Sequence, residues 1–172
     1  MADYTYVLTF NLPDREADPE AHPDALYEAG SDDPSVGVGR LGVIGLDFTR
    51  DAPSAEDALS SVIANVQHAI PRATLVQAGP DLVGLTETAE VFGFSRQNMR
   101  KYATAHAAGR DAFPVPAFIG GPTLWHLAEV ALSLKANTAV PVSDDLIAVA
   151  KATAKINHDL EAGRLQRLAA LA

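Results

Sequence analysis

The chain has 172 residues, a mean hydropathy of +0.05 and a formal net charge of −9, and 48% of its residues are hydrophobic. This composition is typical of a protein that forms a core, and it excludes a disordered tail. The lack of cysteine excludes disulfides, thiolate metal sites and cysteine nucleophiles. No apolar run reaches the roughly 18 residues that span a bilayer, and MADYTYVLTF lacks the basic region of a signal peptide. We therefore expect a cytoplasmic protein.

The negative charge is confined to the first half of the chain. Residues 1–80 contain 13 acidic residues (Asp and Glu) and 4 basic residues (Lys and Arg), whereas residues 81–172 contain 9 acidic and 9 basic residues. Phosphate repels the acidic half but not the neutral half. The asymmetry predicts domains with different partners.

Six segments of the first half have strand or helix patterns. Residues 4–12 alternate apolar with polar side chains and are rich in β-branched and aromatic types, as in a strand. Ser54, with Asp57 three residues later, is typical of a helix start. Its expected buried face is Ala55, Ala58, Leu59, Val62, Ile63 and Val66. In chain order we expect a strand (4–12), a helix (22–30), strands (35–40 and 42–50), a helix (54–70) and a strand (73–78).

This β-α-β-β-α-β order predicts a ferredoxin-like sandwich over residues 1–79, within an overall α+β fold. The segment GVGRLG (37–42) formally fits the dinucleotide fingerprint G-x-G-x-x-G. That fingerprint works only where the glycines turn a strand into a helix, and here a second strand pattern follows. We interpret the glycines as a hairpin.

The second half opens with a helix-turn-helix pattern. Thr86 is expected to cap a first helix, Gly93 to supply the left-handed residue of a sharp turn, and Ser95 to cap a second helix over 95–107. Ala89 falls where two such helices approach each other and only a small side chain fits. The apolar residues expected inside the pair are Leu85, Phe92, Phe94, Met99 and Tyr102.

The outward face of the second helix is cationic and polar, with residue types that read base edges and hold phosphates. An ordinary helical hairpin with a solvated charged face is the alternative, but the glycine and apolar positions constrain the pattern more than charge does. We predict DNA contacts from Ser95, Arg96, Gln97, Asn98, Arg100, Lys101 and Thr104.

The next segment, FPVPAFIGGPTLWHLAEVALSL (113–134), has two short extended pieces and then a helix from about His126. We expect a two-stranded wing beside the second helix. With this wing, residues 82–134 resemble the winged helix-turn-helix of the excisionase/AlpA and MerR-like group. In that group a TxxEAAxxxGxSRQ type segment is followed by FPxPxxxGGxxxWxxxxV.

The resemblance implies a role for individual residues. It assigns the second helix to DNA contact, Gly120 and Gly121 to the wing turn, and Trp125 and Val130 to the core. Two positions depart from the family pattern: His126 stands where arginine is frequent, and Pro122 where a basic wing residue is common.

A long helix is expected in the last segment, with Ser143 as its cap and an apolar stripe of Leu146, Val149, Ala150, Ile156 and Leu160. This stripe fits either packing on its own domain or contact with a second copy. The expected domains are thus 1–79, 80–138 and 139–172, and we expect a homodimer.

No catalytic pattern is present in the sequence. The five histidines have no metal-ligand spacing, and Asp32 and Asp33 are expected to be a solvated pair. We expect no enzyme, cofactor or metal, but a transcriptional regulator that binds double-stranded DNA sequence-specifically. The acidic domain is expected to dimerise or to bind a small effector or a protein partner. The alternative is an antitoxin-like accessory module whose acidic domain docks a protein.

Overall fold

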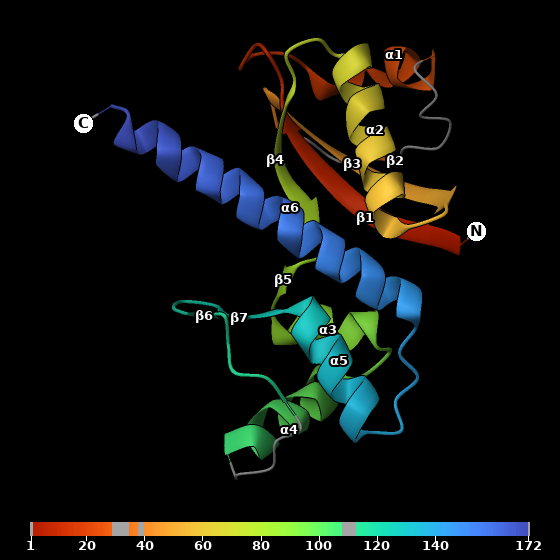
Figure 1. The fold of residues 1–172 in the computed structure, drawn as a ribbon, viewed down its shortest axis with the longest axis vertical. Coiled ribbons are helices and arrows are strands. Elements are labelled where there is room, and N and C mark those ends of the chain that lie inside the picture. The colour runs from red at the N-terminus through yellow and green to blue at the C-terminus, as the bar shows by residue number, and fades with distance from the viewer. Residues whose placement is uncertain (1, 29–34, 38–39, 108–112, 172) are drawn as a thin grey trace. The chain divides into compact units, whose positions relative to one another are not determined.

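The computed structural model describes residues 2–28, 35–37, 40–107 and 113–171 (Figure 1). The α+β class expected from the sequence is confirmed: small antiparallel sheets occur with several helices and one long C-terminal helix. The chain forms two compact units. Unit 1 comprises residues 1–79 with 155–172, and unit 2 comprises residues 80–154.

Unit 1 is built on a four-stranded sheet. Its elements are β1 (Ala2–Asn11), the 3₁₀ turn η1 (Pro19–Ala21), α1 (Pro23–Glu28), β2 (Ser35–Gly37), β3 (Val43–Ala52), α2 (Ala55–Ala69) and β4 (Thr74–Gly79). The strand order is β2-β3-β1-β4, and every neighbouring pair is antiparallel. The predicted order of strands and helices is therefore confirmed.

The core of unit 1 lies between α2 and one face of the sheet. Along β1, Tyr6, Leu8 and Phe10 are buried, whereas the residues between them are more exposed, which is the alternation that a half-covered sheet requires. Ser54 caps α2 by accepting a hydrogen bond from the Asp57 N–H at 3.1 Å, as predicted. The predicted buried face of α2 is confirmed except at Ile63, which is only half-buried.

The free edge of β4 is covered by a side chain from the C-terminal helix. The Asn157 amide donates to the Ala78 carbonyl and accepts from the Ala78 N–H, both at 2.8 Å. It thereby occupies backbone groups that an additional strand would otherwise use.

The GVGRLG segment lies between antiparallel β2 and β3, with Gly37 ending β2 and Gly42 preceding β3 at a φ of +76°. Residues 38–39 lie outside the described residues. Because β3 and not a helix follows Gly42, the context for dinucleotide binding is missing. The structure thus agrees with the hairpin interpretation.

Unit 2 combines short helices with a three-stranded antiparallel sheet of order β5-β7-β6. Its elements are β5 (Leu82–Val83), α3 (Leu85–Val91), α4 (Arg96–Ala107), β6 (Phe118–Ile119), β7 (Thr123–His126) and α5 (Leu127–Asn137), followed by the start of α6. The main core cluster is Ala89, Met99, Phe113, Trp125, Val130 and Leu134. The core positions assigned to Trp125 and Val130 are thus confirmed.

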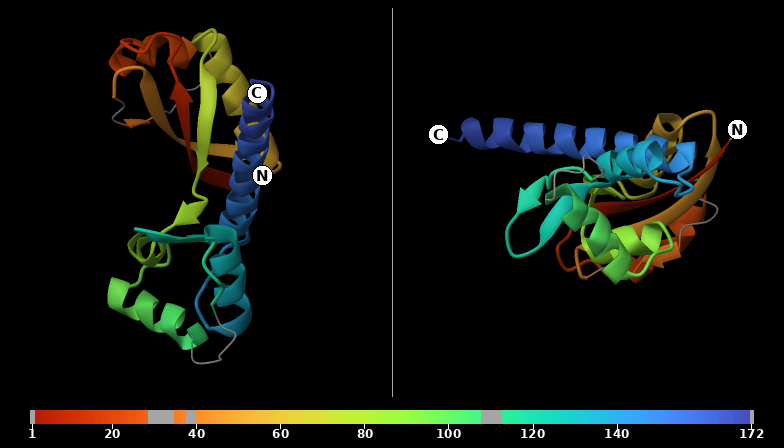
Figure 2. Two further views of the ribbon diagram at one scale, coloured as in Figure 1. Left: turned by 90° about the vertical axis from the view of Figure 1, so that its left-hand side faces the viewer. Right: turned by 90° about the horizontal axis from the view of Figure 1, so that it is seen from below.

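The C-terminal helix α6 (Asp144–Ala169) is continuous through Gly163 (Figures 1 and 2). Ser143 caps it, because its hydroxyl accepts from the Leu146 N–H at 3.1 Å, as predicted. Instead of forming a third compact unit over 139–172, the helix is divided after Ala154 between the two units. Of the expected stripe, Val149 and Ala150 are buried, and the other members are half-buried: Leu146, Ile156 and Leu160. No helix among the described residues combines the length and the apolarity needed to cross a membrane.

Candidate nucleic-acid interface

Helices α3 and α4 are joined by a turn that Gly93 makes possible. Gly93 has a φ of +67°, a conformation that costs a residue with a side chain but not glycine. The following N–H, of Phe94, donates to the Ala89 carbonyl at 2.7 Å and closes the end of α3. Ala89 and Met99 are buried together in the core cluster, so the two helices are held at a fixed place relative to each other.

The start of α3 differs from the sequence prediction. Thr86 is not its cap: Gly84 occupies the cap position, and the helix begins at Leu85. The Glu87 carboxylate accepts from the Gly84 N–H at 2.6 Å, and the Thr88 hydroxyl donates to the Gly84 carbonyl at 2.7 Å. The third residue of the helix thus supplies the hydrogen bond to the backbone of the cap residue. A sequence prediction that looks for a capping hydroxyl, such as that of Thr86, does not find this arrangement.

Helix α4 turns its apolar residues inward and its cations outward. Met99 is fully buried, and Tyr102 and Ala103 are half-buried against the core cluster. The predicted contact residues in the helix are all exposed: Arg96, Gln97, Asn98, Arg100, Lys101 and Thr104. Positions four apart lie one turn from each other on a helix. Arg96 therefore lies in one row with Arg100, and Gln97 with Lys101.

The two hydroxyl groups of the predicted set have local partners. Ser95 accepts from the Asn98 N–H at 3.2 Å and so caps α4, as expected. Thr104 donates to the carbonyls of Arg100 at 2.8 Å and Lys101 at 3.2 Å. Because their hydrogen-bonding capacity is partly used inside the helix, the charged and amide side chains are left as the main outward donors.

The charge distribution of α4 opposes the helix dipole. Each of the other described α-helices has Asp or Glu in its first turn, where the positive end of the dipole favours an anion. Helix α4 has none there, and its first two turns carry Arg96, Arg100 and Lys101 instead. Within the part of the chain that the structure describes, no ion pair involves these three cations. The arrangement costs helix stability and leaves exposed positive charge at the start of the helix.

The hairpin of β6 and β7 is apolar at its tip. Phe118 is 50% and Ile119 79% exposed, and Gly120 and Gly121 lie in the connecting turn. A side chain at Gly120 would meet the Phe118 ring at 2.5 Å, so glycine is required for this ring position. At the base of the hairpin, Trp125 donates its indole N–H to the Pro114 carbonyl at 3.1 Å.

His126 is engaged inside unit 2. Its Nδ1 lies 2.7 Å from a carboxylate oxygen of Asp81, which is 6% exposed, and the Asp81 carbonyl accepts from the Leu127 N–H at 2.7 Å. This arrangement links β5 to the start of α5. Sequence reasoning missed it because the two residues are 45 positions apart and neither belongs to a motif.

Nothing matches this chain in comparisons with protein-family models, curated proteins and solved structures. The described residues contain no group of three or more His, Asp or Glu side chains that could hold a metal ion. Asp32 and Asp33, singled out from the sequence, lie outside the described residues.

Proposed function

We propose that unit 2 is a winged helix-turn-helix that binds double-stranded DNA sequence-specifically, with α4 in the major groove. The observation that carries the proposal is the outward row of cations on α4, which no described carboxylate neutralises. Phosphate is the natural counter-charge for such a surface. The buried Ala89 and the left-handed Gly93 support the helix-turn-helix geometry.

The proposed roles depend on position along α4. The N-terminal residues of a recognition helix approach base edges, so Arg96 and Gln97 read bases, and Asn98 adds an exposed amide beside them. Arg100 and Lys101 lie one turn further and hold phosphates. In this proposal the wing meets DNA through apolar Phe118 and Ile119 and the turn glycines, because His126 is held by Asp81.

Unit 1 is proposed to be a ferredoxin-like domain with a regulatory role. Its strand order, its antiparallel pairing and the burial of α2 on one sheet face support that fold. We also propose that the protein acts as a homodimer, because one recognition helix covers few base pairs. Leu165 and Leu168, more than half exposed near the end of α6, are available for such a contact.

The test begins with recovery and sequencing of genomic fragments bound by the full-length protein. Arg96→Ala and Gln97→Ala should then each weaken binding to the recovered site by about 1 to 3 kcal/mol, and binding to random duplex much less. Lys151→Ala is the matched control, since Lys151 is an exposed cation on α6 in the same unit. Equal losses on both duplexes for the α4 variants would refute base reading.

The second candidate is an antitoxin-like module that docks a protein. The exposed apolar tip of the hairpin favours it, because Phe118 and Ile119 offer an exposed aromatic and an exposed branched side chain. Phe118→Ala would separate the two candidates. In a DNA-binding protein it should weaken binding to all duplexes alike and leave the base preference unchanged, because the wing reads no bases in this proposal. In a docking module it would abolish binding of the protein partner through the tip.

A further inference from the structure

Unit 1 contains a pocket of about 440 Å³ at one end of its sheet. Small-molecule sites have volumes of roughly 300 to 1,000 Å³. The pocket is formed by the end of β1, the loop after this strand and the turn before β3, and its lining residues are Asn11, Leu12, Pro13, Arg15, Arg40, Leu41, Gly42 and Val43. All of these residues belong to unit 1.

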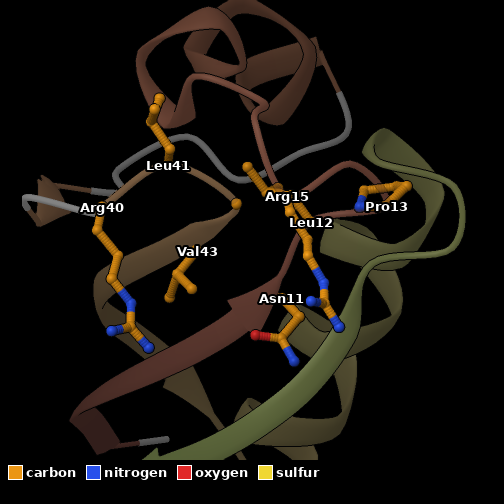
Figure 3. A pocket seen from close by; sticks show the side chains of 8 residues that line it. Asn11, Leu12, Pro13, Arg15, Arg40, Leu41 and Val43 are labelled. Carbon is orange, nitrogen blue, oxygen red and sulfur yellow. The ribbon is translucent and has the colours of Figure 1, made fainter.

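Two of the lining residues are arginines in an acidic region. Residues 1–79 contain only four cations, Arg15, Arg40, Arg50 and Arg72, so half of them line this one pocket. Among the residues that the structure describes, no acidic residue lines it. Figure 3 shows the Arg15 and Arg40 side chains on either side of Asn11 and Val43, with both guanidinium groups extending in the same direction.

The guanidinium groups have no anionic partner in the described structure. Arg15 and Arg40 are exposed, and no ion pair joins either of them to a described carboxylate. Guanidinium binds carboxylate and phosphate oxygens through paired, charge-assisted hydrogen bonds. The exposed Asn11 amide adds a neutral donor between them.

The backbone beneath the arginines is fixed by three contacts. The Leu12 N–H donates to the Gly42 carbonyl at 2.8 Å, and the Gly42 N–H donates to the Ala17 carbonyl at 2.9 Å. A Cβ at Gly42 would lie 2.6 Å from the Arg15 carbonyl oxygen, so the loop of Arg15 and the turn of Arg40 are in close contact. The two arginine-bearing segments are thus held together without a ligand, as a preorganised site requires.

We propose that this pocket binds a small organic dianion, a dicarboxylate or a phosphate ester. Arg15 and Arg40 bind its charged groups, and the apolar side chains of Leu12, Leu41 and Val43 contact its carbon skeleton. Two cations select a doubly charged ligand over a singly charged one. The negative charge of the surrounding domain repels anions, so an anion that contacts only one of the two arginines binds weakly.

Isothermal titration calorimetry on the full-length protein tests this proposal, with succinate and inorganic phosphate as separate probes. At least one probe should bind saturably, and Arg15→Gln and Arg40→Gln should each weaken that binding by about tenfold or more. Arg72→Gln is the matched control, because it removes one exposed cation of the same unit that does not line the pocket. It should leave the affinity unchanged.

Three results would overturn the proposal. The first is that neither succinate nor phosphate binds saturably. The second is that Arg72→Gln weakens binding as much as Arg15→Gln and Arg40→Gln do, since this would indicate a general effect of charge. In the third, Arg15→Gln and Arg40→Gln weaken duplex DNA binding as strongly as Arg100→Gln does, and the pocket then belongs to the DNA surface. Circular dichroism of each variant establishes that it is folded, so that a lost signal counts against the site and not against the fold.

Discussion

At the level of single residues, Tyr6 shows how burial changes chemistry in unit 1. The side chain is 1% exposed, and its hydroxyl donates to the Ala58 carbonyl of α2 at 2.9 Å. Burial raises the pKa of Tyr6 from 10.0 to about 12, and the nearby charge of Arg50 opposes this shift. The phenol is therefore kept neutral and serves as a hydrogen-bond donor between sheet and helix.

This raised pKa predicts a loss of stability in alkaline solution. Below about pH 10 the phenol is neutral in the folded and the unfolded protein, so its contribution to the free energy of unfolding is fully present. Above that pH the unfolded chain ionises first, and stability falls until the folded pKa of about 12 is reached. Each pH unit in this window costs up to about 1.4 kcal/mol.

Comparison with Tyr6→Phe isolates the effect, because both proteins retain every other tyrosine. Near neutral pH the wild type should be more stable by about 1 kcal/mol, the contribution of one hydrogen bond. As the pH rises above about 10 this difference should shrink and then reverse, since phenylalanine does not ionise. Urea unfolding at several pH values measures the difference in the free energy of unfolding between the two proteins. A difference that stays constant with pH would contradict the raised pKa of Tyr6.

At the level of elements, two glycines with the same backbone conformation have different surroundings. Gly93, between α3 and α4, has a φ of +67° and open space where a Cβ would be. Gly42, before β3, has a φ of +76°, and a Cβ there would lie 2.7 Å from the Arg15 Cα. The first position tolerates a side chain at the cost of the backbone conformation alone, whereas the second also requires the Arg15 backbone to move.

The two alanine variants should therefore differ in stability. Gly93→Ala should cost about 1 to 2 kcal/mol, and Gly93→Asn less, because asparagine tolerates this conformation better. Gly42→Ala should lower the free energy of unfolding by more than about 3 kcal/mol, since a buried clash adds to the conformational cost. Urea unfolding followed by Trp125 fluorescence reports on unit 2, and circular dichroism reports on the whole chain. Equal costs at the two glycines would refute this account.

Local sequence patterns predicted the helices and strands well, but they did not predict the contacts between these elements. The Ser54, Ser95 and Ser143 caps depend on residues three positions away, so the sequence alone contains the information. The Gly84 cap was missed because its side-chain partner, Glu87, lies inside the helix and not at the cap position.

Long-range polar contacts could not be predicted. Asn157 binds the Ala78 backbone from 79 positions away, and His126 meets Asp81 from 45. Neither pair belongs to a periodic pattern, because a single polar side chain in a half-buried site leaves no repeat. The arginine pocket was missed for the same reason, since Arg15 and Arg40 meet only through the pairing of β1 with β3.

At the level of the whole molecule, charge divides between the two units. Unit 1 holds 15 Asp and Glu against 7 Lys and Arg, a net charge of −8, and unit 2 holds 7 against 6, a net charge of −1. Taken as a whole, unit 2 is close to neutral, so the cations of α4 are a local feature. In the proposed complex with DNA, attraction would then depend on close contacts, and unit 1 would contribute a repulsion that is screened over roughly 8 to 10 Å at physiological salt.

This division predicts how a fragment of residues 80–154 compares with the full chain. If the fragment is folded by circular dichroism, it should keep the base preferences of the full chain and bind random duplex more tightly, because the −8 of unit 1 is removed. The two cations of α4 that are proposed to hold phosphates should release about two counterions, so log affinity should fall with log salt at a slope near −2 for each bound helix. The slope should be similar for both proteins, since both keep Arg100 and Lys101. A folded fragment that binds no DNA would instead place the contacts in unit 1 and favour a protein-docking role for α4.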